Sequence, residues 1–202
     1  MPLSAFRRAT FLCLMLIALA TPARAQDIFA TPFMGLKFGG GTSIVDLEVA
    51  AGRLAFTMGG SIVLLGDGIL GYEADFGYLP GYFERDASQP LIKPGSYVID
   101  LSGGLIAALP AGVTRGGLRP YVVAGAGLIN AQAADLLEVF VIRRTVPGYK
   151  LGVGAQGLLT NNVGVRFDLR HIRSFTGDDG SLARVGRRIS YSRLTVGLLL
   201  RL

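Results

Sequence analysis

The stretch GYEADFGY, residues 71–78, places two carboxylates inside an otherwise apolar and aromatic run. Successive residues of a β-strand face opposite sides, so the stretch divides into two faces. Glu73 and Asp75 share one face with two glycines, whereas Tyr72, Phe76 and their neighbours form an apolar face. The stretch therefore predicts a strand with a small, charged side and an apolar side.

The same division recurs along the chain. In VGVRFDLR (163–170), valine, phenylalanine and leucine alternate with glycine, arginine and aspartate, and SRLTVGLLLRL (192–202) alternates in the same way. Each segment has the roughly ten residues that a tilted membrane-spanning strand needs. The alternation predicts eight strands, at about 30–41, 54–65, 69–81, 95–108, 119–130, 147–159, 163–174 and 189–202.

The N-terminus has the features of a secretory signal. Arg7 and Arg8 form a positive region, residues 10–20 are apolar, and Ala23 and Ala25 are the small residues that signal peptidase reads. We expect residues 1–25 to be a cleaved signal peptide and residues 26–202 to form one barrel domain. The single cysteine lies in the leader, so the mature chain is expected to use no disulfide.

The charge of the chain belongs partly to this leader. Without Arg7, Arg8 and Arg24, 17 of the 20 basic residues remain beside 14 acidic ones, a net charge of +3. Such a small excess on an exported chain argues against nucleic acid as a partner. Half of the residues are hydrophobic, yet no apolar run beyond the leader is long enough for a spanning helix. A closed barrel is the other structure that satisfies its backbone groups in lipid.

The connections between the predicted strands alternate in length. Residues 66–68 and 160–162 are tight turns and 109–118 is moderate, while the connections near 42–53, 82–94, 131–146 and 175–188 are longer. This is the layout of an outer-membrane barrel, with short periplasmic turns and long external loops. The apolar run 132–142 either extends two strands beyond the membrane or folds as a short helix over the barrel mouth.

We therefore predict an all-β fold, an eight-stranded antiparallel up-and-down transmembrane barrel. Eight strands enclose a space that side chains fill, so inward charges of both signs should form a packed ion-pair network. Inward glycines are expected to make room for the long basic side chains. The predicted lumen network consists of Lys37, Glu73, Asp75, Asp100, Lys150, Arg166, Asp168, Arg170, Arg193 and Arg201.

Several segments resemble a known family. LGYEADFGYLPGYF (70–83), RPYVVAGAG (119–127) and the ending NNVGVRFDLRH…SRLTVGLLLRL are similar to the small outer-membrane β-barrel domains that include OmpA-like and opacity-type barrels. The resemblance covers the whole mature chain and implies an ion-paired interior with variable surface loops. Members often end in an aromatic residue that the outer-membrane assembly machinery reads, whereas this chain ends in Leu202 on the apolar face.

No motif indicates catalysis, a cofactor or a metal. GVGAQG (152–157) matches a dinucleotide-binding pattern, but it lies within an alternating strand and no helix follows. His171 is on the opposite face from Asp168, and its spacing from Ser174 does not suit a lipid-facing catalytic pair. Asp178 and Asp179 are too few ligands for calcium.

These observations predict a non-enzymatic outer-membrane barrel with a plugged lumen, which presents loops for surface interaction or supports envelope integrity. A narrow porin-like channel and a lipid-modifying enzyme are the alternatives, and a soluble ligand-binding barrel is the rival fold. The expected partners are outer-membrane lipid, the assembly machinery and a loop ligand, with the barrel as a monomer. Arg184, Arg187 and Arg188 are candidates for contact with lipopolysaccharide phosphates, although they also suit a solvated loop.

Overall fold

The computed structural model describes residues 27–42, 54–81, 96–114, 117–134, 141–175 and 189–202. The predicted signal peptide, the Asp178–Asp179 pair and the cluster of Arg184, Arg187 and Arg188 lie outside these ranges.

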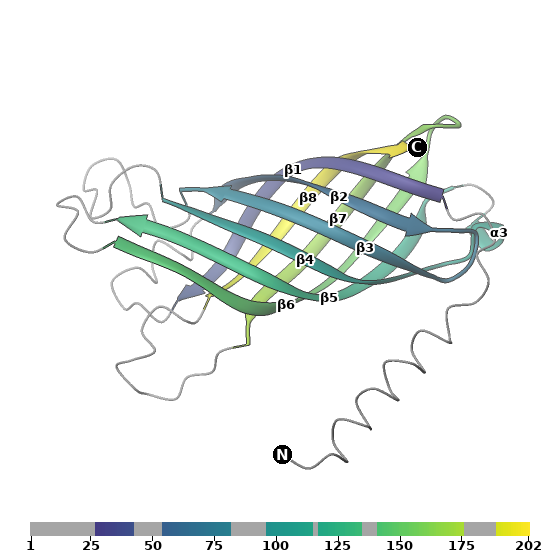
Figure 1. Ribbon diagram of the computed structural model, residues 1–202. Coiled ribbons are helices and arrows are strands. Elements are labelled where there is room, and N and C mark those ends of the chain that lie inside the picture. The colour runs from purple at the N-terminus through teal and green to yellow at the C-terminus, as the bar shows by residue number, and fades with distance from the viewer. Residues whose placement is uncertain (1–26, 43–53, 82–95, 115–116, 135–140, 176–188) are drawn as a thin grey trace, which may run out of the picture.

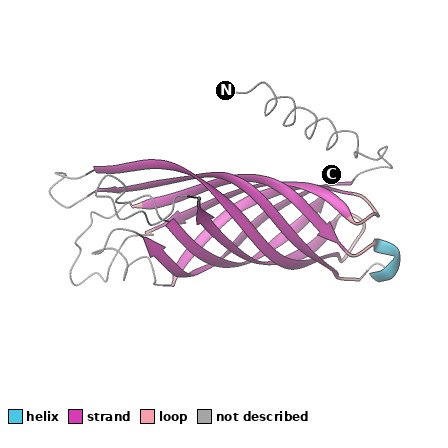
Figure 2. Ribbon diagram, turned by 90° about the horizontal axis from the view of Figure 1, so that it is seen from below, coloured by secondary structure: helices cyan, strands magenta, loops and turns pink. Residues whose placement is uncertain are grey.

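Eight antiparallel strands pair in chain order and close into a barrel (Figures 1 and 2). This arrangement confirms the predicted fold class. One four-residue helix, α3 (Ala111–Thr114), lies in the connection between β4 and β5. The strands are β1 (Asp27–Thr42), β2 (Ala55–Leu65), β3 (Leu70–Pro80), β4 (Tyr97–Ala108), β5 (Arg119–Ala134), β6 (Val141–Leu158), β7 (Val163–Ser174) and β8 (Ile189–Arg201). Among the described residues, no helix is long and apolar enough to cross a membrane.

The barrel is closed by the pairing of its first and last strands. The ladder between β1 and β8 shifts register between Phe38 and Gly41. Gly39 lies at this shift with a φ of 56°, a conformation that glycine adopts at little cost. At the other end of the ladder, the Leu202 amide donates to the Ile28 carbonyl at 2.9 Å, which joins the two chain ends at the rim.

The strand ends divide into two groups. The C-terminus lies at the same end of the barrel as α3 and the short connections (Figure 1). The two described ends of the apolar run 132–142 belong to extended strands, because Ala134 of β5 pairs with Val141 of β6. Residues 135–140, which join these two strands, lie outside the described ranges.

The two faces of each strand have opposite environments. Outward-facing leucines and valines are about half exposed, as at Leu101 (57%) and Val196 (46%), and they cover the wall on all sides. Inward-facing residues of both apolar and charged types are buried. An apolar outside with a polar interior is the arrangement of a barrel whose solvent is lipid, and it is the reverse of a soluble ligand-binding barrel.

Candidate functional site

Nine of the ten charged residues expected in the lumen lie inside the barrel, each no more than 4% exposed. They come from six strands, so the network joins segments far apart in the sequence. Their inward direction follows from the period-two alternation of each strand. These residues, which we call the charged layer, are Lys37, Glu73, Asp75, Asp100, Lys150, Arg166, Asp168, Arg170 and Arg193.

Arg170 lies at the centre of the charged layer. Its Nη1 donates to Glu73 Oε1 at 2.6 Å and to Asp75 Oδ2 at 2.9 Å, and its Nη2 donates to Asp168 Oδ1 at 2.7 Å. One guanidinium therefore joins three carboxylates from two strands. Lys150 adds a second positive charge at 3.0 Å from Glu73 and 3.4 Å from Asp75.

Arg166 extends the charged layer toward the end of the barrel that carries the short turns. It forms an ion pair with Glu73, and its Nε lies 3.0 Å from Asp168 Oδ2. The same Nε donates to the Tyr121 hydroxyl at 2.7 Å, and the guanidinium carbon lies 4.7 Å from the centre of the Tyr121 ring. The Tyr121 hydroxyl in turn donates to Asp168. The phenol therefore links an arginine and a carboxylate that belong to the same strand.

Arg193 extends the layer toward the other end. It forms an ion pair with Asp75, and its Nη1 lies 3.2 Å from Asp100 Oδ2. Asp100 also accepts a hydrogen bond from the Tyr191 hydroxyl at 2.7 Å. The Phe33 ring lies under the Arg193 guanidinium, with 4.8 Å between the guanidinium carbon and the ring centre. Lys37 is fully buried and directly opposite Arg193 in the ladder between β1 and β8.

Arg201 does not belong to this layer. Its side chain is 41% exposed and pairs at 2.6 Å with Asp27, whose side chain is 26% exposed. The alternation of β8 does point position 201 inward, but the strand ends there, at the rim of the barrel. Alternation predicts the side of a strand and not its depth, which is why sequence reasoning grouped this arginine with the lumen.

Buried apolar clusters lie on both sides of the charged layer, and sequence reasoning missed them. Both clusters occupy inward positions toward the strand ends, so following the alternation beyond the charged residues would have identified them. The cluster at the end with the long connections contains Leu79, Val98, Ile129, Ala131, Val146, Ile172, Ile189 and Tyr191. The cluster at the end with the short turns contains Phe29, Val63, Leu65, Ile106, Ala108, Tyr121 and Leu199.

Inward glycines give the large side chains their space. A Cβ atom added at Gly77 would collide with both Arg193 and Asp100, and one at Gly152 would lie 2.9 Å from Arg170 Cγ. Because glycine has no side chain, the ion pairs have room to cross the barrel at these positions.

The charged layer holds five basic and four acidic residues, almost entirely shielded from solvent. Removing charges from water is costly unless they are paired and hydrogen-bonded, and here each carboxylate contacts at least one arginine. The arginines cannot lose their protons in ordinary conditions, so their positive charges are constant. This arrangement joins opposite sides of the barrel by ion pairs, and the four carboxylates of the charged layer are all buried.

The histidine has a partner that sequence reasoning overlooked. His171 is exposed on the outer wall, and its Nδ1 lies 3.1 Å from Ser192 Oγ on the neighbouring strand. Ser174 instead faces inward and accepts a hydrogen bond from the Ile189 amide at 3.1 Å. The outer wall therefore carries a His–Ser pair that the spacing of His171 and Ser174 did not indicate. The pair was missed because its members are 21 residues apart and meet only through strand register.

The His171–Ser192 pair still falls short of a catalytic triad. Within the described part of the chain, no carboxylate contacts the His171 ring to orient it. Asp168, the nearest acidic residue in the sequence, faces the lumen. The GVGAQG segment lies entirely within β6, where the helix that a dinucleotide site requires is replaced by the continuing strand.

A barrel with an apolar wall and a buried charged interior is the pattern of a transmembrane β-barrel. Residues 10–201 match the family model described as the outer membrane protein beta-barrel domain. The chain therefore belongs to this family of outer-membrane barrels. Comparison with curated proteins gives no match.

Solved structures share the fold. Neisserial surface protein A is 16% identical, with a TM-score of 0.61 and coverage of 87% of this chain and 97% of that one. The N-terminal barrel domain of Pseudomonas aeruginosa OprF is 18% identical, with a TM-score of 0.51 and coverage of 86% and 97%. Ail, the attachment invasion locus protein of Yersinia pestis, is 14% identical, with a TM-score of 0.51 and coverage of 89% and 100%. At these identities the likeness concerns the fold alone.

Proposed function

We propose that this protein is a non-enzymatic outer-membrane barrel with a plugged lumen, whose external loops serve surface interaction or envelope integrity. The observation that supports the plug is the sequence of layers along the lumen. A charged layer shielded from solvent lies between two buried apolar clusters. A hydrated ion crossing this barrel would have to break several ion pairs and pass two apolar regions.

Single-channel recording tests the plug directly. Purified protein is inserted into planar bilayers, and current is recorded from the wild type and from Arg170→Ala, which deletes the side chain that joins three carboxylates. We expect a silent wild type, with any leakage confined to the variant. Leu169→Ala is the matched control, because Leu169 is the preceding residue of β7 and faces outward. Steady wild-type conductance would overturn the plug and make a narrow channel the better assignment.

The proposed partners lie around the barrel rather than within it. The half-exposed apolar wall supports contact with outer-membrane lipid. We propose that Arg184, Arg187 and Arg188 contact lipopolysaccharide phosphates, that Leu202 takes part in recognition by the assembly machinery, and that the barrel is a monomer. Arginine suits phosphate because its planar guanidinium donates two parallel hydrogen bonds.

The loop arginines can be tested by binding. Replacing Arg184, Arg187 and Arg188 together with glutamine should weaken binding of lipopolysaccharide to the protein in detergent by about tenfold or more, since each charge-assisted contact contributes over 1 kcal/mol. Surface plasmon resonance with immobilised barrel measures the change. Unaltered binding would assign these arginines to a solvated loop.

A further inference from the structure

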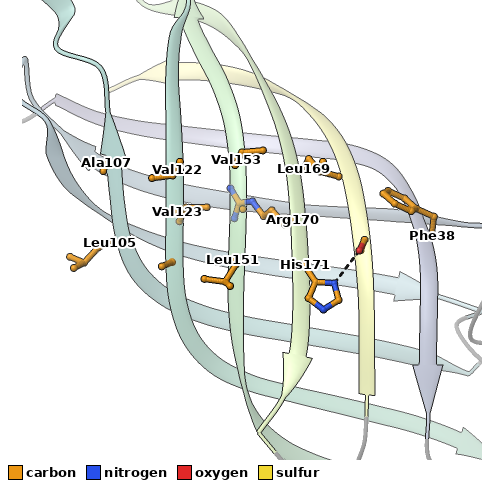
Figure 3. A pocket seen from close by; sticks show the side chains of 13 residues that line it. Phe38, Leu105, Ala107, Val122, Val123, Leu151, Val153, Leu169, Arg170 and His171 are labelled. Carbon is orange, nitrogen blue, oxygen red and sulfur yellow. Dashed lines mark hydrogen bonds between the residues drawn. The ribbon is translucent and has the colours of Figure 1, made fainter.

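The outer wall carries an open pocket of about 640 Å³ that the proposed lumen plug does not explain. Apolar side chains from β4 to β7 form most of it, including Leu105, Val122, Leu151 and Leu169 (Figure 3). Two small residues, Ala124 and Gly152, also line it. Because this face of the barrel is exposed and apolar, the molecule that covers it in the membrane is lipid.

Strand register places the polar pair among the apolar residues that line this pocket. Ala124 lies opposite Leu151, Leu151 opposite His171, His171 opposite Ser192, and Ser192 opposite Phe38, so these lining residues form one row across the wall. His171 points to Ser192 within this row (dashed line in Figure 3). This contact uses only the Nδ1 atom of His171. The Nε2 atom has no hydrogen-bond partner among the described residues, so it is available to a ligand.

Further polar residues continue the same face toward the end with the long connections. Arg173 follows His171 by two residues and is exposed, and its partners in the ladders are Tyr149 and Ser190. Along the outer face of β7 the residues therefore change from Phe167 and Leu169 to His171 and Arg173. The corresponding wall of β3 and β4 carries the rings of Tyr78 and Tyr97, whose centres lie 5.9 Å apart at an angle of 45° between the ring planes. The described residues of these two strands include no lysine or arginine.

We propose that this wall binds one phosphorylated acyl lipid of the outer leaflet, for which lipid A is the probe. An acyl chain lies in the pocket over Ala124. The head group meets the polar residues above it, with phosphate at Arg173 and hydrogen bonds to His171 and Ser192. A cation, a ring nitrogen and a hydroxyl beside an apolar pocket match a ligand that is anionic at one end and aliphatic along its length. The site does not depend on whether the lumen is plugged.

The sole histidine of the sequence offers a direct readout. The barrel, with its histidine labelled by ¹³C and ¹⁵N, is placed in phosphatidylcholine nanodiscs and titrated with lipid A, and the ring resonances of His171 are recorded. We expect a shift that saturates near one lipid A per barrel. Phosphatidylglycerol, which is also anionic, should need about tenfold more lipid for the same shift, because it presents a single diester phosphate.

Two matched pairs of variants locate the site. Ala124→Phe fills the pocket, whereas Ala126→Phe adds the same ring at the next outward position of β5, outside the pocket. Arg173→Gln removes the proposed phosphate ligand, whereas Arg201→Gln removes an exposed arginine at the opposite end. We expect Ala124→Phe and Arg173→Gln to weaken lipid A binding by about tenfold, and both controls to stay within about twofold.

Circular dichroism and heat-dependent mobility in gels verify that each variant is folded. If Ala124→Phe fails to fold, the comparison of Arg173→Gln with its control Arg201→Gln tests the proposal alone. A His171 shift that rises without saturation, or one of equal size with phosphatidylglycerol, would overturn the proposal. It would equally be overturned if both test variants bound lipid A as the wild type does, because the polar residues would then mark only the membrane boundary.

Discussion

In this narrow barrel, the single residue Arg170 makes several of the buried ion pairs. It contacts Glu73, Asp75 and Asp168, so Arg170→Ala leaves three buried carboxylates short of a partner. Breaking a buried ion pair from one side typically costs about 3–5 kcal/mol, and we expect a loss of unfolding free energy in that range. Urea titration in lipid vesicles measures the loss. A change below about 1 kcal/mol would mean that Lys150 and Arg166 compensate fully.

Arg201 is the matched control for this experiment. It also forms an ion pair, with Asp27, but at the exposed rim. Pairs in such surroundings contribute about 0–1 kcal/mol, so Arg201→Ala should leave the unfolding midpoint nearly unchanged.

Gly77 provides a second test at the scale of one residue, because a methyl group there collides with both Arg193 and Asp100. Gly77→Ala should cost about 1–3 kcal/mol through overpacking. Gly68, in the turn between β2 and β3, has no atom within 4 Å of an added Cβ, so Gly68→Ala should be close to neutral. Equal effects of the two substitutions in the same urea titration would show that backbone entropy, and not space, sets the cost.

The sequence indicates the direction of these side chains but not their partners. Alternation alone assigns Glu73 to one face and Tyr72 to the other, because period two is a property of any strand. It does not reveal that Glu73 meets Arg166 and Arg170, which lie 93 and 97 residues later. The His171–Ser192 pair was hidden for the same reason, since it depends on the register between β7 and β8.

The sequence predicted the strands themselves better than the side-chain contacts between strands. Six of the expected segments agree with the structure to within three residues at each end, because turn residues and alternation delimit them. The exceptions are the facing ends of β5 and β6. There the run 132–142 is apolar on both faces, so period two is lost and a strand cannot be distinguished from a short helix. Pairing with the neighbouring strand decides the outcome.

The depth of a strand residue in the membrane gives a prediction at this scale. Leu101 is 57% exposed near the middle of β4, and Leu109 is 47% exposed just beyond its end. Leu101→Arg should destabilise the folded barrel in lipid vesicles by about 2–4 kcal/mol, and Leu109→Arg by about 0–1 kcal/mol. Equal costs in equilibrium unfolding would mean that the short-turn end lies deeper in the bilayer than its polar connections indicate.

At the scale of the whole molecule, the closed ladder can be tested by cross-linking. Ala30 of β1 lies opposite Leu200 of β8 on the outer wall, and the predicted mature chain has no cysteine of its own. Paired cysteines at 30 and 200 should link efficiently with a short bifunctional reagent in the folded barrel. Cysteines at 30 and 194 are the control, since residue 194 lies opposite Leu36 instead. Equal yields for the two pairs, assayed by gel mobility, would contradict the register.

The pairing of β1 with β8 limits the order in which the barrel can assemble. A strand that starts at Asp27 finds one of its two neighbours only when residues 189–201 have emerged. Until then it presents a row of unpaired amides and carbonyls, which hydrocarbon does not tolerate. Stepwise insertion, one hairpin after another, would therefore leave an open edge in the bilayer at every stage but the last. Translocation and membrane entry must be separate events for this chain, with the early strands held in an aqueous or protein-lined environment until the final one arrives.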